Sequence, residues 1–289
     1  MSVRKFLLPV TSKDSAQAAL HVGLLLARTW NAHLDVLYVP SDSRDIAPLA
    51  GEGLSSTLIE NMMATSEKEN KARLQTLRDL FAAAADEAQI PVGAAQFGTN
   101  EPSTRFVVVE GREEQIIAHQ ARLADLTIVP HPLAGEDVAT AEALHAVLFD
   151  SGRPVLLAPV QPPAHIGRRI AIAWNGTAYA ASALASAMPF IRHAEAVQIL
   201  ASDEYSRSGP PAEAVQDYIA QHGVNAEIQR FTTSDRTVGA GLLDAAQNFG
   251  ADIMTMGAYS TASRLRQLIL GGVTRHVLQY AEICVLMNR

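Results

Sequence analysis

The residues best suited to hold a ligand lie in a segment near the C-terminus that is rich in glycine and hydroxyl side chains. Its candidate binding residues are Gly257, Ala258, Tyr259, Ser260, Gly271, Gly272, Val273 and Thr274. Glycine lets a backbone approach an anion closely, and the amides at the start of a helix favour negative charge. The segment therefore indicates a site for an anionic group. A second interpretation stays open, in which the segment is a polar turn whose glycines only allow a helix to pack closely on a sheet.

Other reactive side chains give weaker signals. His131 follows an apolar run, where a catalytic residue could lie, and it is a candidate for small-molecule chemistry in the first half of the chain. Three further histidines have no second ligand at i+3 or i+4, the spacing that a helical metal site needs: His119, His145 and His276. The single cysteine, Cys284, excludes a thiolate cage and an internal disulfide framework. We therefore expect no metal cage.

The charge pattern argues against nucleic-acid and membrane partners. The 289 residues carry a formal net charge of −7 and contain no run of lysine and arginine, whereas both kinds of partner normally need a basic patch. The apolar run at residues 6–8 is too short for a signal peptide. No stretch approaches the roughly 18 apolar residues of a membrane span. Together with the lone cysteine, which fits a reducing compartment, these features predict a cytoplasmic protein.

The elements that must position the candidate residues occur twice. Four pairs of apolar segments recur in the same order: 4–10 and 168–174, 34–39 and 196–201, 124–129 and 251–256, and 154–158 and 284–288. One match would be weak, but four in order predict a duplicated unit. The alternative is that any α/β protein repeats strands and helices. The prolines of residues 159–164 indicate a linker, so we place a first domain at 1–160 and a second at 161–289.

Each half alternates short strands with helical patterns. Helices are expected at 15–30, 57–88, 113–121 and about 139–149, and again at 178–191, 212–222, 241–249 and about 265–280. Third strands are expected at 106–109 and 226–231. Such alternation with right-handed crossovers gives a doubly wound parallel sheet. Ligands of these sheets lie beyond the carboxyl ends of the strands, so the loops after the first and fourth strands of each half are the ones that matter.

The second half resembles the universal stress protein family. The stretch from Gly257 to Met287 contains Gly-Ala-Tyr, then Ser-Arg-Leu-Arg-Gln-Leu-Ile-Leu-Gly-Gly-Val-Thr-Arg-His-Val-Leu, and a closing Val-Leu-Met. The loop after the first strand is similar to the family's Asp-Gly-Ser, and its residues join the candidate site: Trp174, Asn175, Gly176 and Thr177. The resemblance implies the tandem form, with two Rossmann-like (adenine nucleotide alpha hydrolase-like) α/β domains. Each would be a five-stranded parallel sheet of order 3-2-1-4-5 flanked by helices.

The resemblance also implies ATP as a ligand of the second half, held by a partial site. Nucleotide-binding members carry Gly-x2-Gly-x9-Gly followed by Ser or Thr around the phosphates. Here Gly257 matches the first glycine, but Ser260 replaces the second, and ten residues separate it from Gly271. Gly272 stands where the hydroxyl is expected, and Asn175 replaces an aspartate that contacts ribose or adenine. An uncharged amide can still form hydrogen bonds there.

The first half departs further from the family pattern. Pro130 and Pro132 remove amide donors that a phosphate cradle needs. The first loop, with Thr11 and Ser12, lacks both aspartate and glycine. We therefore expect this half to hold no triphosphate and to serve as a partner domain.

The family resemblance implies a way for the two halves to assemble. The last strands, 155–157 and 285–287, would pair along their edges and make an intramolecular pseudo-dimer, which would satisfy edges that otherwise invite aggregation. The chain is also expected to form a homodimer. Three functions follow, in order of preference. The first is a stress-response protein that binds an adenine nucleotide and is at most a slow ATPase, since no general base can be named. The second is a structural or interaction module without a nucleotide, and the third is an enzyme that uses His131.

Overall fold

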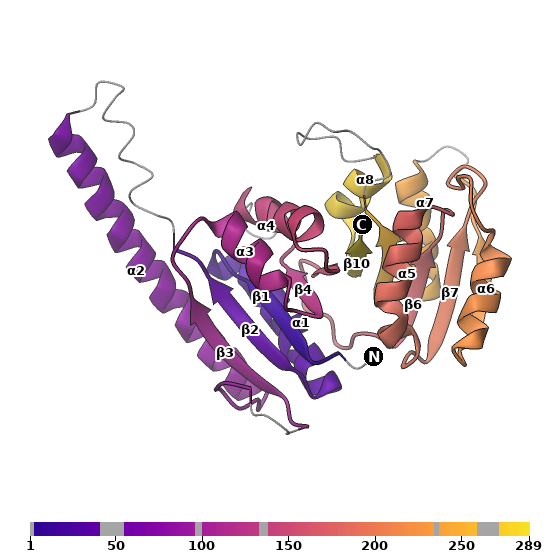
Figure 1. The fold of residues 1–289 in the computed structure, drawn as a ribbon, viewed down its shortest axis with the longest axis horizontal. Coiled ribbons are helices and arrows are strands. Elements are labelled where there is room, and N and C mark those ends of the chain that lie inside the picture. The colour runs from indigo at the N-terminus through magenta and orange to yellow at the C-terminus, as the bar shows by residue number, and fades with distance from the viewer. Residues whose placement is uncertain (1–2, 41–54, 96–99, 133–137, 234–236, 259–271) are drawn as a thin grey trace.

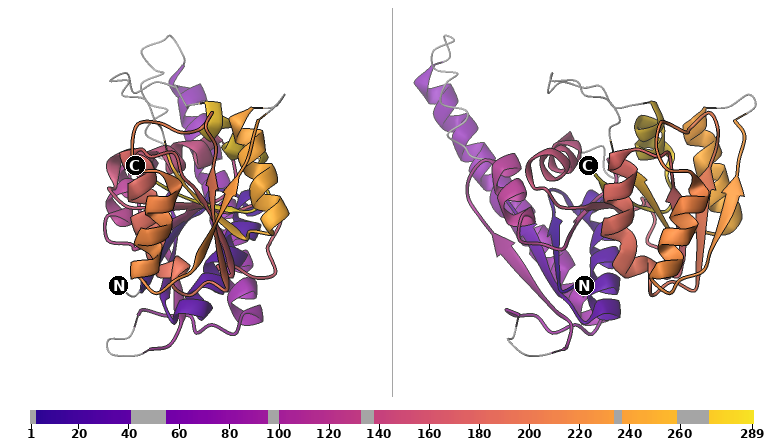
Figure 2. Two further views of the ribbon diagram at one scale, coloured as in Figure 1. Left: turned by 90° about the vertical axis from the view of Figure 1, so that its right-hand side faces the viewer. Right: turned by 45° about the vertical axis from the view of Figure 1, so that its right-hand side comes forward.

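The computed structural model describes residues 3–40, 55–95, 100–132, 138–233, 237–258 and 272–289. Within these residues the chain forms one sheet with helices on both faces (Figures 1 and 2). The first half contains β1 (Lys5–Pro9), α1 (Lys13–Trp30), β2 (His33–Tyr38), α2 (Ser56–Glu87), β3 (Ser103–Val108), α3 (Glu113–Ala121), β4 (Leu126–Val129), α4 (Val138–Asp150) and β5 (Val155–Leu157). The second half contains β6 (Arg169–Ala173), α5 (Ala178–Ile191), β7 (Ala196–Ala201), α6 (Ala212–Gln221), β8 (Ala226–Arg230), α7 (Val238–Phe249), β9 (Ile253–Gly257), α8 (Gly272–Tyr280) and β10 (Cys284–Asn288).

The strand order has an internal symmetry. The sheet runs β3-β2-β1-β4-β5-β10-β9-β6-β7-β8, so each half reads 3-2-1-4-5 when its strands are numbered from its own start. Within each half the strands are parallel, and the two halves meet where β5 and β10 pair antiparallel, with Leu156 opposite Leu286. The pairing of these two edges was predicted and is confirmed. The ten strands consequently form one continuous sheet, and the predicted boundary near residue 161 falls in the connection between β5 and β6.

The hydrophobic core has two layers, one on each face of the sheet. Alternate strand residues point to opposite faces. One layer packs under α1, α2, α5 and α6, and the other packs under α3, α4, α7 and α8. Both layers contain residues from both halves. On the first face Trp30 of α1 meets Phe190 of α5 edge-on, with ring centroids 5.1 Å apart, so helix packing reinforces the seam between the halves.

Two aspartates close the amino edge of the sheet in the same way in each half. Asp125 Oδ2 accepts hydrogen bonds from the backbone N–H groups of Arg4 and Lys5 at 2.7 and 3.0 Å. Asp252 accepts from the N–H groups of residues 167, 168 and 169 at 2.9 to 3.2 Å. The contacts of both residues are therefore structural. The shared device supports duplication of one unit.

Helix boundaries follow their capping residues. The helix expected from residue 241 begins at Val238, because the Thr237 hydroxyl accepts a hydrogen bond from the Ala240 amide and caps the first turn. The last helix was expected from about 265, and its part before Gly272 lies outside the described residues. Within the described parts of the chain, no helix is long and apolar enough to span a bilayer. The same residues contain no group of three or more His, Cys, Asp or Glu side chains that could hold a metal ion.

Candidate functional site

The loop between β6 and α5 is a preformed turn at the carboxyl edge of the sheet. Asn175 Oδ1 accepts hydrogen bonds from the backbone N–H of Thr177 at 3.2 Å and from its hydroxyl at 2.8 Å. The Thr177 hydroxyl in turn accepts from the Ala180 amide at 3.2 Å and caps α5. Gly176 has a φ of +80°, which favours glycine. The sequence Asn-Gly-Thr therefore fixes the local backbone through its own side chains.

The segment after β7 folds over this turn. Trp174 Nε1 donates to the Pro210 carbonyl at 2.8 Å, and the Arg207 amide donates to the Asn175 carbonyl at 2.9 Å. A Cβ added to Gly209 would lie 2.0 Å from the Gly176 carbonyl oxygen, so only glycine fits there. Sequence analysis did not predict this cover, because its residues lie more than thirty positions from the turn. A Gly-Pro-Pro run was the available signal.

Gly257 is the last residue of β9 and packs against the start of α5. A Cβ at this position would lie 2.6 Å from both the Ala180 amide nitrogen and the Tyr179 carbonyl carbon. The next residue, Ala258, is fully buried and its amide donates to the Asn288 carbonyl at 2.9 Å. Gly257 is thus required by close packing of a helix on a strand, as the second interpretation of the segment stated.

The start of α8 lies at the same edge of the sheet. His276 of α8 packs on the start of α7, where its Nδ1 lies 3.4 Å from the Thr237 hydroxyl. Gly272 is exposed and a Cβ there would meet no described residue within 4 Å, so packing among the described residues does not require this glycine. Val273 is half-buried and Thr274 is buried. The remaining candidates, Tyr259, Ser260 and Gly271, lie outside the described residues.

The described candidates share one chemistry. They come from the turn at 174–177, the strand end at 257–258 and the helix start at 272–274, all at the carboxyl edge of the second half. They offer backbone amides, one side-chain amide and hydroxyls, and none of the described candidates ionises near neutral pH. This arrangement can bind through hydrogen bonds and the partial positive charge of a helix start.

His131 occupies the corresponding edge of the first half. It follows β4 and is buried, with 2 % of its surface exposed. Burial lowers the pKa of its imidazole, because the charged form loses hydration. A neutral ring at neutral pH follows.

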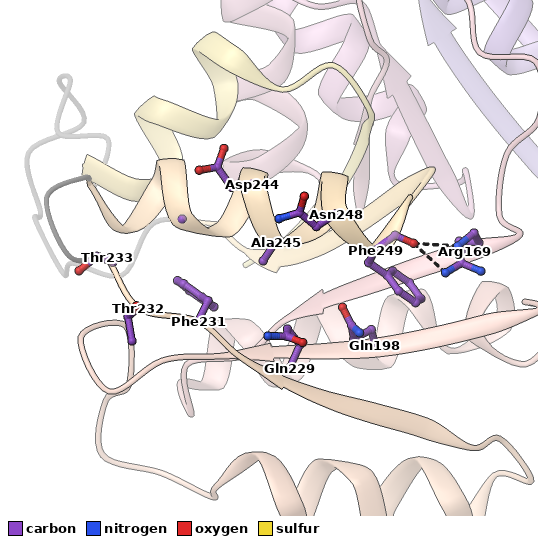
Figure 3. Close-up of a pocket in the computed structure, with 11 residues that line it drawn as sticks. Arg169, Gln198, Gln229, Phe231, Thr232, Thr233, Asp244, Ala245, Asn248 and Phe249 are labelled. Carbon is purple, nitrogen blue, oxygen red and sulfur yellow. Dashed lines mark hydrogen bonds between the residues drawn. The ribbon is translucent and has the colours of Figure 1, made fainter.

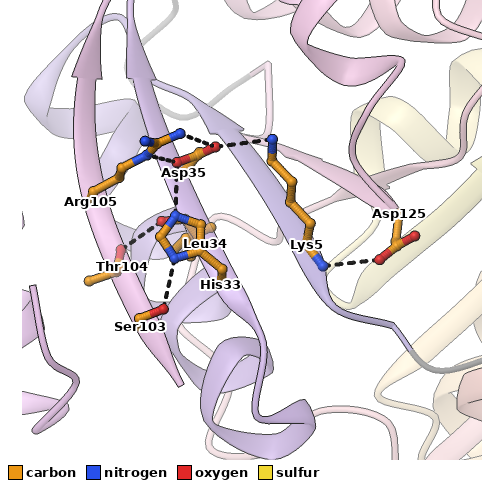
Figure 4. A network of polar contacts seen from close by, with 8 residues as sticks. All are labelled: Lys5, His33, Leu34, Asp35, Ser103, Thr104, Arg105 and Asp125. Carbon is orange, nitrogen blue, oxygen red and sulfur yellow. Dashed lines mark hydrogen bonds and ion pairs between the residues drawn. The ribbon is translucent and has the colours of Figure 1, made fainter. Parts of the chain in front are cut away.

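A polar cluster that sequence analysis missed lies on the sheet face of the first half (Figure 4). Asp35 is buried and accepts hydrogen bonds from the guanidinium of Arg105 and, at 3.0 Å, from Nε2 of His33. Nζ of Lys5 lies 3.3 Å from the same carboxylate, and the other nitrogen of His33 lies 2.8 Å from the Ser103 hydroxyl. Burial alone would raise the pKa of Asp35, but the hydrogen bonds from His33 and Arg105 and the charge of Arg105 hold it well below its usual range.

The chain is similar to known proteins both in sequence and in structure. The sequence model of the universal stress protein family matches residues 167–289. A universal stress protein from Archaeoglobus fulgidus superimposes with a TM-score of 0.66 at 15 % identity, covering 100 % of this chain and 99 % of the other. A functionally unknown protein from Pseudomonas aeruginosa superimposes with a TM-score of 0.56 at 17 % identity, covering 99 % and 92 % of the two chains. No curated protein matches the chain in sequence.

The structural matches show a shared fold over the whole length, and the sequence match places the family's domain in the second half. Over residues 167–289, the chain is similar in sequence to the universal stress protein family.

Proposed function

We propose that this chain is a cytoplasmic stress-response protein with two universal stress protein domains, 1–160 and 161–289, of which the second binds an adenine nucleotide. ATP is the candidate ligand. The observation that carries the proposal is the gathering of the capped turn at 174–177, the end of β9 and the start of α8 at one edge of the sheet. This edge is where an open α/β sheet places ligands.

The start of α8 suits the phosphates. Backbone amides and the helix dipole favour an anion there, and Gly272 leaves open space beside the first turn. The amide of Asn175, two residues before the cap of α5, would face the sugar or the base. No described side chain among the candidates can act as a general base, so the proposal is binding, with hydrolysis slow at most.

The first half offers less to a phosphate. Its first-loop hydroxyls are used in capping α1, since Ser12 Oγ lies 2.8 Å from Ser15 Oγ and accepts from the Ser15 amide. Pro130 and Pro132 flank His131 and lack N–H groups. We propose that this half is a partner domain within an intramolecular pseudo-dimer, and that a homodimer forms from such chains.

Two matched glycine variants test nucleotide binding. Gly272 and Gly93 are both open to an added Cβ, and neither has a positive φ. Gly272→Val should abolish the heat of ATP binding in isothermal titration while the melting temperature stays within a degree or two, and Gly93→Val should bind as the unmodified chain does. Equal ATP binding by both variants, or no binding by the unmodified chain, would overturn the proposal.

A second function, an interaction module without a nucleotide, is favoured by one observation. Gly257 and Asn175 already have structural roles, one in packing against α5 and the other in holding the cap of that helix. Mass spectrometry of small molecules released from the denatured protein separates the two functions, because a nucleotide-binding chain should release adenine nucleotide. Light scattering of the folded protein, before denaturation, tests the homodimer.

A further inference from the structure

A pocket opens on the sheet face of the second half, under α7 (Figure 3). Its volume is about 430 Å³, which lies in the range of small-molecule sites. Strands β6, β7 and β8 form the floor, and α7 forms the roof. The pocket shares no lining residue with the candidate nucleotide site.

Neutral amides dominate the middle of the pocket. Gln198 comes from β7 and Gln229 from β8, and the register of the two strands puts both side chains on the same face. Asn248 faces them from α7. The Gln229 side-chain nitrogen donates one hydrogen bond to the Arg230 carbonyl at 2.9 Å, which leaves its second proton and its oxygen for a ligand.

The cation of the pocket is turned toward the helix end. Arg169 donates from Nε and Nη2 to the Phe249 carbonyl at 2.9 and 2.7 Å, and its guanidinium lies 4.3 Å from the centre of the Phe249 ring. Asp244 lines the pocket one turn before Asn248 on α7. Arg169 and Asp244 are the charged members of the described lining (Figure 3). Phe231 and Phe249 add aromatic surface.

In the first half, side chains occupy the position that is equivalent to the pocket. Leu7 of β1 pairs with Asp35, and Ala171 of β6 pairs with Gln198, so the two side chains hold equivalent positions in the duplicated sheet. Around Asp35 the space is occupied by the ion cluster of Figure 4. Around Gln198 a pocket remains, lined by the neutral amides of Gln198, Gln229 and Asn248 together with Arg169 and Asp244. At equivalent places in the duplicated sheet, the first half thus has an internal salt-bridge cluster and the second half has an open, amide-lined space.

We propose that this pocket binds a small, uncharged, planar heterocycle with a lactam edge, of the uracil type. A carboxamide and a lactam match each other, because each presents one N–H donor beside one carbonyl acceptor and two hydrogen bonds form at once. Aromatic walls suit a flat ring. The three amides offer a charged ligand no ion pair, and the Arg169 guanidinium already donates to the Phe249 carbonyl.

Uracil itself is the first probe, titrated into the full chain up to about 10 mM and followed by ligand-observed NMR. We expect saturable binding. The ring of 1,3-dimethyluracil has the same plane and carbonyls but no N–H donor, so it should not bind. Binding of both compounds with equal affinity, or of neither, would refute the proposal.

Three leucine variants locate the binding. Gln198→Leu and Gln229→Leu keep the side-chain size and remove the amides, and each should weaken uracil binding about tenfold. Gln221→Leu is the matched control, since Gln221 is exposed on α6 away from the pocket, and it should bind normally. Unchanged melting temperatures show that the variants fold. Uracil binding that survives both pocket substitutions would overturn the assignment, and Gly272→Val should leave it intact because the two sites are separate.

Discussion

The strongest test of the fold's energetics is Asp35→Asn. The Asp35 side chain is only 5 % exposed, whereas Lys5 and Arg105 are 34 % and 45 % exposed. Removing one partner of a buried ion pair typically costs about 3–5 kcal/mol, because the other charge is left buried. Here water can still reach both cations, so we expect a loss of about 2–3 kcal/mol in the free energy of unfolding at pH 7. Asparagine keeps the size of the side chain, so the loss reports the charge.

The loss should depend on pH with a definite sign. The folded pKa of Asp35 lies below the unfolded value of about 3.9. The carboxylate therefore contributes its full stabilisation above about pH 4, and the contribution falls as the pH drops toward the folded pKa. Each pH unit below 3.9 removes about 1.4 kcal/mol, so the difference between the chain and Asp35→Asn should shrink by about 1 kcal/mol between pH 5 and pH 3.

Urea unfolding followed by circular dichroism at pH 7, 5 and 3 measures this difference. Asp79→Asn is the control, because Asp79 is exposed on α2 and accepts one hydrogen bond from a neighbouring glutamine at 2.8 Å. It should change stability by less than about 0.5 kcal/mol at each pH. A loss below 1 kcal/mol for Asp35→Asn at pH 7, or a loss that grows on acidification, would refute the reasoning.

Three further substitutions test particular contacts. Gly257→Ala should cost about 1–3 kcal/mol in urea unfolding, because its Cβ would lie 2.6 Å from the Ala180 nitrogen, and unchanged stability would contradict the packing role. Leu286→Ala, at the fully buried seam, should cost about 2–5 kcal/mol in the same assay. Trp174→Phe removes the hydrogen bond to Pro210, so it should cost about 1 kcal/mol and speed proteolysis after β7, and resistance equal to that of the unmodified chain would argue against a cover held by this bond.

The strands and helices were predictable because each is encoded locally. Apolar runs of the β type predicted the strands. Helical patterns predicted α3 and α5 with their observed bounds, Glu113–Ala121 and Ala178–Ile191. The pairing of β5 with β10 was predicted from the family resemblance rather than from the residues, since nothing local distinguishes one buried edge from another. Duplication predicted that the second half repeats the elements of the first, and the two halves do repeat their aspartate contacts at the amino edge.

The site was harder to predict because its determinants are far apart in sequence. Gly257 looked like a phosphate-loop glycine, and only the position of α5, almost eighty residues earlier, shows that packing requires it. The ion cluster joins residues of three strands, with Asp35 and Arg105 seventy positions apart. No periodic pattern in the sequence predicts contacts between residues so far apart. The glutamines of the pocket likewise looked like ordinary polar positions of strands.

The duplicated sheet explains why the two halves can differ so much in chemistry. Pairing of β5 with β10 turns two inner edges into one seam, so the halves share a core and stabilise each other. A half that is stabilised by its neighbour can lose an internal ion cluster without unfolding, and the second half has an amide-lined pocket where the first half has Asp35 and its cations. If pairing of β5 with β10 stabilises both halves, then Leu286→Ala should lower the free energy of unfolding of both halves together, in a single transition. Two separated transitions would mean that each half is stable alone, and that the pocket needs no support from its partner.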